Sequence, residues 1–289
     1  MTIHKILSFF LIFGMILPAT GQSLALASEG EGVHCEESAT WDACFIENQA
    51  FQVGEEITYK LYYHWGLIWL SAGEVVFKVE EGEQGEYYLS AVGRTYSSYE
   101  WFFKVRDKYE CYVEKESLLP SVAIRQVKEG KYRLYDKLTF DQAARKVVSL
   151  RGDTKDQTIR RTFDLQDCMH DILSVIYYTR NLNFDQLEVG EKFPVKIFMD
   201  KEVFSLDVHY KGKENDKKIK GLGRFRTLKF SPEVIAGEVF DEDTEMNVWA
   251  TDDGNRVPLL IESPVSVGSV KAVLKSYKGL RHEMEAKQK

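Results

Sequence analysis

The chain has 289 residues, of which 44% are hydrophobic and 29% are charged. This is the composition of a folded globular protein, and it excludes a disordered chain and a multi-span membrane protein. A formal net charge of −7 argues against nucleic-acid binding. Aromatic residues make up 13% of the chain, which favours strands over a helical bundle.

Residues 1–27 are predicted to be a signal peptide. Lys5 precedes a 12-residue apolar run at positions 6–17. As a helix this run spans about 18 Å, too short for the roughly 30 Å core of a bilayer. A small-x-small cleavage site follows at 25–27, and a second candidate site follows Gly21. An uncleaved N-terminal anchor is the alternative.

No later segment approaches the length of apolar sequence that a membrane helix needs. We therefore expect no transmembrane span after cleavage of the signal peptide. The expected location is the periplasm or the outer cell envelope of a bacterium.

Four cysteines follow the predicted signal peptide, and an exported protein can form disulfides. Cys35 and Cys44 lie close together in a polar segment, so we predict a bridge between them. Such a bridge closes a short loop and stabilises by roughly 2.5–3 kcal/mol in the chain-entropy model. Free thiols, or pairing with Cys111 and Cys168, remain open, since four cysteines allow three connectivities. The sequence contains no C-x-x-C motif, which a redox or zinc-ribbon site would need.

Alternating apolar residues predict a half-buried strand at the start of the main domain, where Ile57, Tyr59, Leu61 and Tyr63 share one face. Further short strands are predicted at 70–79, 87–92, 108–113, 121–127, 132–140, 146–150, 193–199, 203–210, 225–230, 237–240, 245–251, 257–263 and 269–277. The fold class is therefore mainly β, an antiparallel meander forming a barrel or half-barrel. The Lys-rich run 211–220 is expected to be a solvated hairpin tip.

One segment, 167–180, breaks this rhythm and predicts an amphipathic helix. Its apolar residues fall at helical spacing: Met169, Ile172, Leu173 and Ile176. Asp167 is the expected N-cap. Arg180 lies near the C-terminal end, where a cation is favoured. The helix is expected to pack one face on the sheet.

The domain organisation follows from these elements. A polar N-terminal segment covers 28–50, and a single β-rich domain covers 51–280. Two β halves joined by the helix are the alternative. Residues 281–289 are expected to form a flexible tail.

Four stretches of this domain carry a resemblance to a known family: 54–59 leading to 65–66, 171–174 with 177–180, 237–240, and 249–253 with 256–258 and 267–270. Across roughly 51–280 the chain resembles the exported bacterial proteins called domain of unknown function 3108. The resemblance implies a β-rich, barrel-like envelope protein and no catalytic residues. A looser likeness, at the level of fold only, is to the half-barrels that carry lipoproteins or lipids across the periplasm.

Catalytic signatures are missing from the sequence. The six histidines form neither H-x-x-x-H nor H-E-x-x-H, and there is no G-x-S-x-G, P-loop or G-x-G-x-x-G motif. His170 and Asp171 are adjacent, so on a helix they point about 100° apart and do not share a site. The acidic run 241–245 lacks the glycine-containing loop of an EF-hand and is expected to be a solvated turn. We therefore predict no catalytic residue, metal or cofactor.

Clustered aromatic residues are the strongest candidates for a ligand-binding site: Tyr63, Trp65, Trp69, Tyr99 and Trp101. Such rings line cavities for acyl chains or stack on sugars, although core packing is the alternative explanation. The leading hypothesis is a non-enzymatic protein that binds an apolar or amphipathic ligand, such as a lipid or glycolipid. A structural or assembly module that binds another envelope protein is the alternative. A hydrolase of envelope polysaccharide or lipid comes third, because only the surplus of carboxylates supports it.

Overall fold

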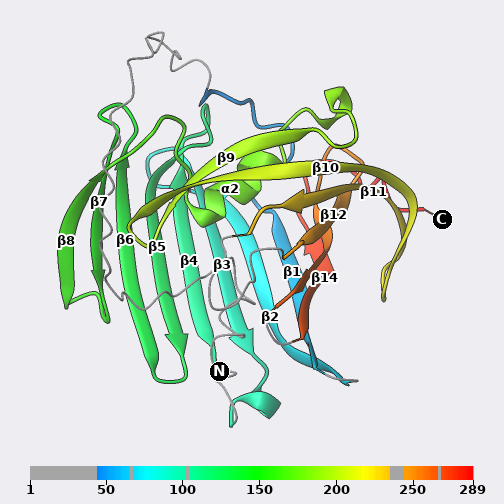
Figure 1. The fold of residues 1–289 in the computed structure, drawn as a ribbon, viewed down its shortest axis with the longest axis horizontal. Helices are drawn as coiled ribbons and strands as arrows, with labels where there is room; N and C mark the ends of the chain where they lie inside the picture. The colour runs from blue at the N-terminus through cyan, green and yellow to red at the C-terminus, as the bar shows by residue number, and fades with distance from the viewer. Residues whose placement is uncertain (1–43, 66–67, 102–103, 235–243, 266–267, 289) are drawn as a thin grey trace, which may run out of the picture.

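The computed structural model describes residues 44–65, 68–101, 104–234, 244–265 and 268–288. Within them, 14 strands form one antiparallel sheet in the order β8-β7-β6-β5-β4-β3-β2-β1-β14-β13-β12-β11-β10-β9 (Figure 1). Neighbours in the sheet are neighbours in the chain, except where β14 pairs with β1. The sheet is an antiparallel meander, as the sequence predicted, and it is not closed, because β8 and β9 are its two edges.

The first eight strands run consecutively from the N-terminal side: β1 Glu56–Trp65, β2 Ile68–Glu81, β3 Tyr87–Thr95, β4 Arg106–Val113, β5 Pro120–Glu129, β6 Tyr132–Asp141, β7 Lys146–Gly152 and β8 Thr158–Asp164. After helix α2, Ile172–Thr179, the remaining strands follow: β9 Lys192–Met199, β10 Glu202–Ile219, β11 Gly223–Pro232, β12 Asn247–Thr251, β13 Pro258–Pro264 and β14 Ser269–Lys278. Two short 3-10 helices are η3 Ser97–Tyr99 and η4 Phe184–Gln186.

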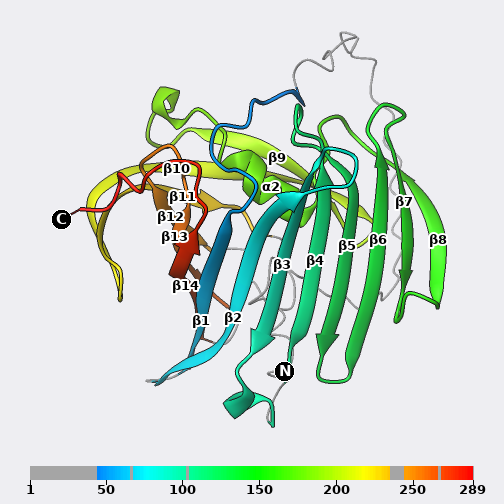
Figure 2. The same ribbon diagram turned by 180° about the vertical axis from the view of Figure 1, so that it is seen from behind.

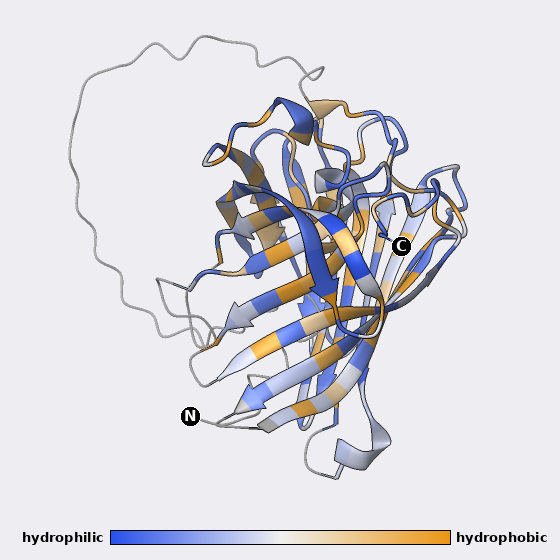
Figure 3. Ribbon diagram, turned by 90° about the vertical axis from the view of Figure 1, so that its right-hand side faces the viewer, coloured by the Kyte–Doolittle hydropathy of each residue, from blue (hydrophilic) through white to orange (hydrophobic). Residues whose placement is uncertain are grey.

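The sheet curls so that its second half faces its first half. Strands β1–β8 form a broad curved wall, and β9 and β10 cross in front of that wall with α2 beneath them (Figures 1 and 2). Hydrophobic and hydrophilic residues alternate along the strands (Figure 3). In β4 this alternation gives strictly alternating buried residues. The buried positions face the concave side, where they form one large core with α2.

Helix α2 begins later than the sequence predicted. Asp171, not Asp167, is the N-cap, and its side chain accepts hydrogen bonds from the backbone N–H groups of Leu173 and Ser174. In turn, the Asp171 backbone N–H donates a hydrogen bond to the Ser174 hydroxyl, which completes a capping box. Asp167 instead pairs with Arg145 at 2.7 Å. His170, directly before the N-cap, forms a parallel bridge to Ile197 of strand β9.

The predicted Cys35–Cys44 disulfide is wrong, because Cys44 is bonded to Cys168. The two Cα atoms lie 5.3 Å apart although 124 residues separate them in sequence. The N-terminal segment lies beside the chain that leads into α2, and this long-range approach leaves no local trace in the sequence. Cys35 lies outside the described residues. Cys111, on β4, is a buried free thiol.

The structure differs from the sequence prediction in three further segments. The run 211–219 is not a hairpin tip but the second part of β10, paired with β11. Strand β8 was not predicted. Residues 281–288 are not a flexible tail, because Ala286 is fully buried and Gln288 donates a backbone hydrogen bond to Arg224.

The predicted strand 237–240 lies outside the described residues, as do residues 1–27 of the predicted signal peptide. No helix in the described ranges is long and apolar enough to cross a lipid bilayer.

Candidate functional site: an apolar cavity beneath helix α2

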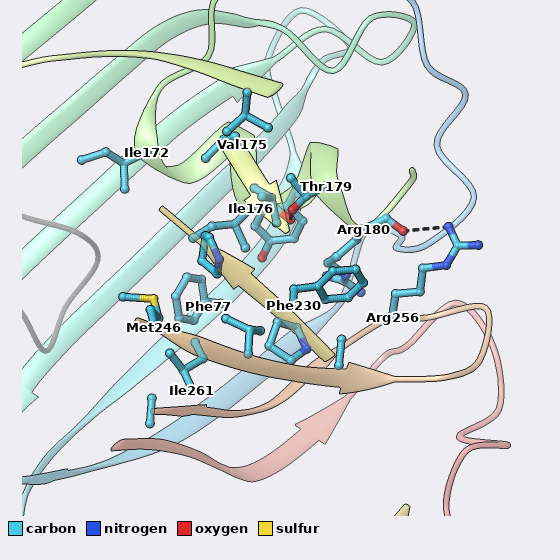
Figure 4. Close-up of a pocket in the computed structure, with 18 of the residues that line it drawn as sticks. Phe77, Ile172, Val175, Ile176, Thr179, Arg180, Phe230, Met246, Arg256 and Ile261 are labelled. Carbon is cyan, nitrogen blue, oxygen red and sulfur yellow. Dashed lines mark hydrogen bonds between the residues drawn. The ribbon is translucent and has the colours of Figure 1, made fainter. Parts of the chain in front are cut away.

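A cavity of about 240 Å³ lies between α2 and the two facing halves of the sheet. Its walls come from β1, β2, α2 and strands β9 to β14. In Figure 4, Ile176 from α2, Phe77 from β2 and Phe230 from β11 lie around the same space. Segments from both halves of the chain are therefore needed to build it.

Helix α2 lines the cavity with one side and packs its other side on the sheet. Ile172, Val175, Ile176 and Thr179 line the cavity, at the i, i+3, i+4 and i+7 positions of a helical stripe. Leu173 and Ser174, on other positions of the helix, are fully buried. The predicted amphipathic character of this helix is confirmed.

The strand residues that line the cavity follow the two-residue period of the sheet. On β1 they are Ile57, Tyr59 and Leu61, and on β2 they are Val75 and Phe77. The opposite wall is equally apolar, with residues from β9 to β14: Phe193, Val195, Ile197, Leu206, Val208, Phe230, Met246, Val248, Ala250, Ile261, Val270 and Ala272. The walls are thus made largely of aliphatic and aromatic side chains.

The hydroxyl groups of two lining residues are bonded to the protein itself. The Tyr59 hydroxyl donates to the Pro258 carbonyl at 2.8 Å, and the Thr179 hydroxyl donates to the Ile176 carbonyl at 3.0 Å. Burial raises the pKa of Tyr59 and of Tyr177, so both phenols are neutral. These walls suit an apolar chain better than a polar ligand.

A buried ion pair closes one end of the cavity. Arg180 donates to both carboxylate oxygens of Glu55, at 2.6 and 2.8 Å, and also to the carbonyls of Ala50 and Asn255. Burial alone lowers the Arg180 pKa, but the charge and hydrogen bonds of Glu55 outweigh it and raise that pKa. Arg180 therefore stays charged, and its charge is directed at the carboxylate of Glu55.

Arg256 lies at the same end, opposite Met246 and Ile261 (Figure 4). Its Nη1 donates to the carbonyls of Arg180 and Leu182, at 3.2 and 2.5 Å. Burial lowers the Arg256 pKa, partly offset by nearby aspartates. Arg256 therefore fixes the C-terminal end of α2 against the β12–β13 connection.

The aromatic residues predicted from the sequence lie elsewhere. Tyr63 is buried on β1 but does not line the cavity. Trp69 is 43% exposed and stacks on His64 with ring centroids 4.4 Å apart, on the outer face of the sheet. Tyr99 is half-buried in η3, and Trp101 beyond it is 84% exposed. The side chain of Trp65 lies outside the described part of the chain.

None of these four placed residues lines the cavity, so the structure does not assemble them into the cavity site. Of the aromatic residues that line it, Tyr59 was predicted to lie on the inner face of the first strand, but the others were not singled out from the sequence: Phe77, Tyr177, Phe184, Phe193 and Phe230. What marks these residues in the sequence is an inward-facing position in a strand or helix. Closeness to other aromatic residues in the sequence does not identify them.

Two buried titratable sites lie outside the cavity lining. Burial lowers the pKa of His170 to about 3, and its Nδ1 lies 3.2 Å from the Ser174 hydroxyl. Burial also raises the pKa of Asp107 to about 6, although hydrogen bonds from Glu129 and the Lys128 N–H oppose it. Among the described residues, no group of three or more His, Cys, Asp or Glu side chains is placed to hold a metal ion.

Comparisons with known proteins agree with this architecture. Residues 58–275 match the family model described as "Protein of unknown function (DUF3108)". No curated protein matches the sequence. Among solved structures, the chain is similar to a beta-barrel-like protein of domain of unknown function DUF1849 from Brucella abortus, with a TM-score of 0.51 and 9% identity. That match covers 79% of this chain and 99% of the other, and it supports the barrel-like fold alone.

Proposed function

This chain belongs to the DUF3108 family, and for it we propose a non-enzymatic binding function, in which the cavity beneath α2 holds the apolar part of a lipid, glycolipid or other amphipathic molecule. The observation that carries the proposal is the cavity itself, with about 240 Å³ of space between aliphatic and aromatic walls. The chemistry of these walls supports an apolar or amphipathic ligand.

Apolar walls make this space a poor site for water. A buried water needs about three hydrogen-bond partners, and apolar cavities of roughly 150 Å³ stay dry and bind small apolar molecules. The lining hydroxyls of Tyr59 and Thr179 are bonded to carbonyls, which leaves their donors unavailable to a ligand. Filling the space with hydrocarbon gains contacts on all sides and displaces no well-bonded water.

We also propose that the protein works outside the cytoplasm. The predicted signal peptide at 1–27 supports this, and so does the Cys44–Cys168 disulfide, because stable disulfides are typical of oxidising compartments. A binding protein for an amphipathic molecule in the cell envelope is consistent with both features.

Substitution of Ala272 tests the proposal. Ala272 lines the cavity on β14, so Ala272→Phe places a ring in the space that the ligand needs. We expect the affinity for the apolar fluorophore N-phenyl-1-naphthylamine to fall at least about tenfold, which is about 1.4 kcal/mol. Fluorescence titration of the full chain measures it, with displacement by dodecanol as the second readout.

Val273→Phe is the matched control, because Val273 does not line the cavity and pairs with Lys60, on the face of β1 opposite the lining residues Tyr59 and Leu61. It should bind the fluorophore like the wild type. A folded Ala272→Phe protein with unchanged affinity contradicts the site, and a wild-type protein that binds no fluorophore contradicts the proposed function.

A further inference from the structure

One wall of the cavity is a two-stranded arm that extends beyond the rest of the sheet. We define the arm as residues 194–207, in which β9 pairs with β10 from Pro194↔Asp207 to Met199↔Glu202. Strand β10 pairs with β11 only from Val208 onward. Val195, Ile197 and Leu206 of the arm line the cavity. Moving the arm would therefore open the cavity along its length.

The outer edge of the arm has little backbone support. In the described part of the chain, β9 is an edge strand, and Pro194 lacks the N–H group that a further strand would need. Two backbone hydrogen bonds join this edge to His170, from the His170 N–H to Lys196 and from the Phe198 N–H to His170. A two-stranded ribbon is marginally stable by itself, so the closed position depends on side chains.

The tip of the arm is held by a buried ion cluster on the facing wall. Asp200 Oδ1 accepts hydrogen bonds from Arg125 Nη2 on β5 and Arg151 Nη1 on β7, each at 2.6 Å. The same two arginine nitrogens contact Asp136 Oδ2 on β6, at 3.1 and 2.9 Å. Two arginines and two carboxylates balance one another, so the closed cluster buries no net charge.

The local backbone places Asp200 for this contact. Asp200 and Lys201 both have positive φ, 51° and 75°, as in the two-residue turns that join twisted hairpins. Burial alone raises the pKa of Asp200, but Arg125 and Arg151 outweigh it and keep that pKa below its usual value. The carboxylate is therefore charged at neutral pH.

The cluster is also incomplete in its closed state. Asp200 Oδ2 is buried, and among the described residues no protein group donates a hydrogen bond to it. A buried carboxylate oxygen without a partner costs free energy that water would recover on opening. The closed contact thus has strong ion pairs through Asp200 Oδ1, whereas Asp200 Oδ2 lacks a hydrogen bond from any described residue. This is expected for a contact that forms and breaks as the arm moves.

We propose that the arm is the gate of the apolar cavity and that the contact of Asp200 with Arg125 and Arg151 is its latch. The arm swings at the point where β10 leaves β11, next to Val208, and an apolar chain passes between β9 and α2. The closed arm then covers the bound chain with Val195, Ile197 and Leu206. This inference rests on the proposed function.

The test uses the full-length chain with Asp200→Asn, which keeps the shape of the side chain and removes its charge. Because the latch is weakened, we expect both association and release of N-phenyl-1-naphthylamine in stopped-flow fluorescence to become about tenfold faster. The equilibrium affinity should stay within about twofold of the wild type. Hydrogen exchange of the His170 and Phe198 amides, whose hydrogen bonds join the edge of the arm to the chain before α2, should speed up by a similar factor.

Asp216→Asn is the matched control, since Asp216 forms an exposed ion pair with Arg224 away from the arm. It should leave both the fluorophore rates and the exchange of the arm unchanged. Unchanged rates and exchange in Asp200→Asn overturn the gate, and so does faster exchange spread equally through β1 to β4, which indicates general destabilisation. A wild-type protein that binds no fluorophore overturns the proposed function and the gate with it.

Discussion

Buried polar residues around the cavity show how single side chains fix this fold. Arg180 joins the C-terminal end of α2 to Glu55 before β1 and to the carbonyl of Asn255. Breaking a buried pair by removing one partner leaves an uncompensated charge, which typically costs about 3–5 kcal/mol. The end of the cavity marked by Arg180 is therefore held by a buried ion pair, whereas the tip of the arm is held by the ion cluster around Asp200.

His170 gives the folded protein a defined pH dependence. Burial lowers its pKa from 6.5 to about 3, so the folded state keeps the ring neutral where the unfolded chain binds a proton. The contribution of His170 to the free energy of unfolding is fully present above pH 6.5, and it is lost as the pH falls from 6.5 toward 3. Between pH 7 and pH 5 the loss amounts to about 2 kcal/mol.

His170→Gln removes this titration. In urea unfolding of the wild type and the variant, the loss of unfolding free energy between pH 7 and pH 5 should be about 2 kcal/mol smaller in the variant. The comparison cancels any constant cost of the substitution, since only the pH-dependent part is read. Equal losses in the two proteins would contradict the lowered pKa, because they would show that His170 binds its proton as readily in the folded state as in the unfolded chain.

At the scale of elements, the disulfide fixes the N-terminal segment to the chain that enters α2. The Cys44–Cys168 bond closes a loop of 124 residues. For long loops the chain-entropy model gives roughly 4–5 kcal/mol of stabilisation, although measured values are typically about 2–4 kcal/mol. The bond therefore contributes to the position of α2 and of the cavity lining it carries.

The double variant Cys44→Ser with Cys168→Ser should lower the unfolding free energy by about 2–4 kcal/mol. Unfolding in urea, with and without a reducing agent, measures this change. Reduction should destabilise the wild type by a similar amount and leave the double variant unaffected. A reductant effect of equal size in both proteins would contradict the Cys44–Cys168 pairing.

Strands were predicted correctly where apolar residues alternate regularly in the sequence. Elements were missed where contacts between distant parts of the chain determine the local structure. The alternation of Ile57, Tyr59 and Leu61 predicted β1, because these residues face the core. Strand β8 was missed because it is a largely exposed edge, with Arg160 and Arg161 exposed in its centre. Charged edges of this kind block further pairing and leave no alternation to detect.

At the scale of the whole molecule, the sheet is an open meander whose two halves face each other across the cavity. A closed barrel has no free edge, whereas this sheet leaves β8 and β9 unpaired with each other in the described residues. The ion cluster around Asp200 joins the two facing walls by side chains alone. Such a seam holds the walls together without a continuous ladder of backbone hydrogen bonds.

The sequence predicted this β-rich, barrel-like architecture, but it did not predict which residues line the apolar cavity. Aromatic residues that are close in sequence, such as Trp69, fall on the outer face because the strand alternates. The residues that line the cavity come from elements that are far apart in the chain, such as Phe77 on β2 and Phe230 on β11. Only the curl of the sheet brings them together.

Photolabelling tests the central claim, that the cavity beneath α2 holds an apolar chain, most directly. The wild-type protein is irradiated with an alkyl diazirine, and the labelled peptides are mapped by mass spectrometry. We predict that label appears in α2 and in strands β12 to β14, and that excess dodecanol prevents it. Label that instead gathers around Trp69 or Trp101, with α2 unlabelled, would contradict the cavity as the binding site.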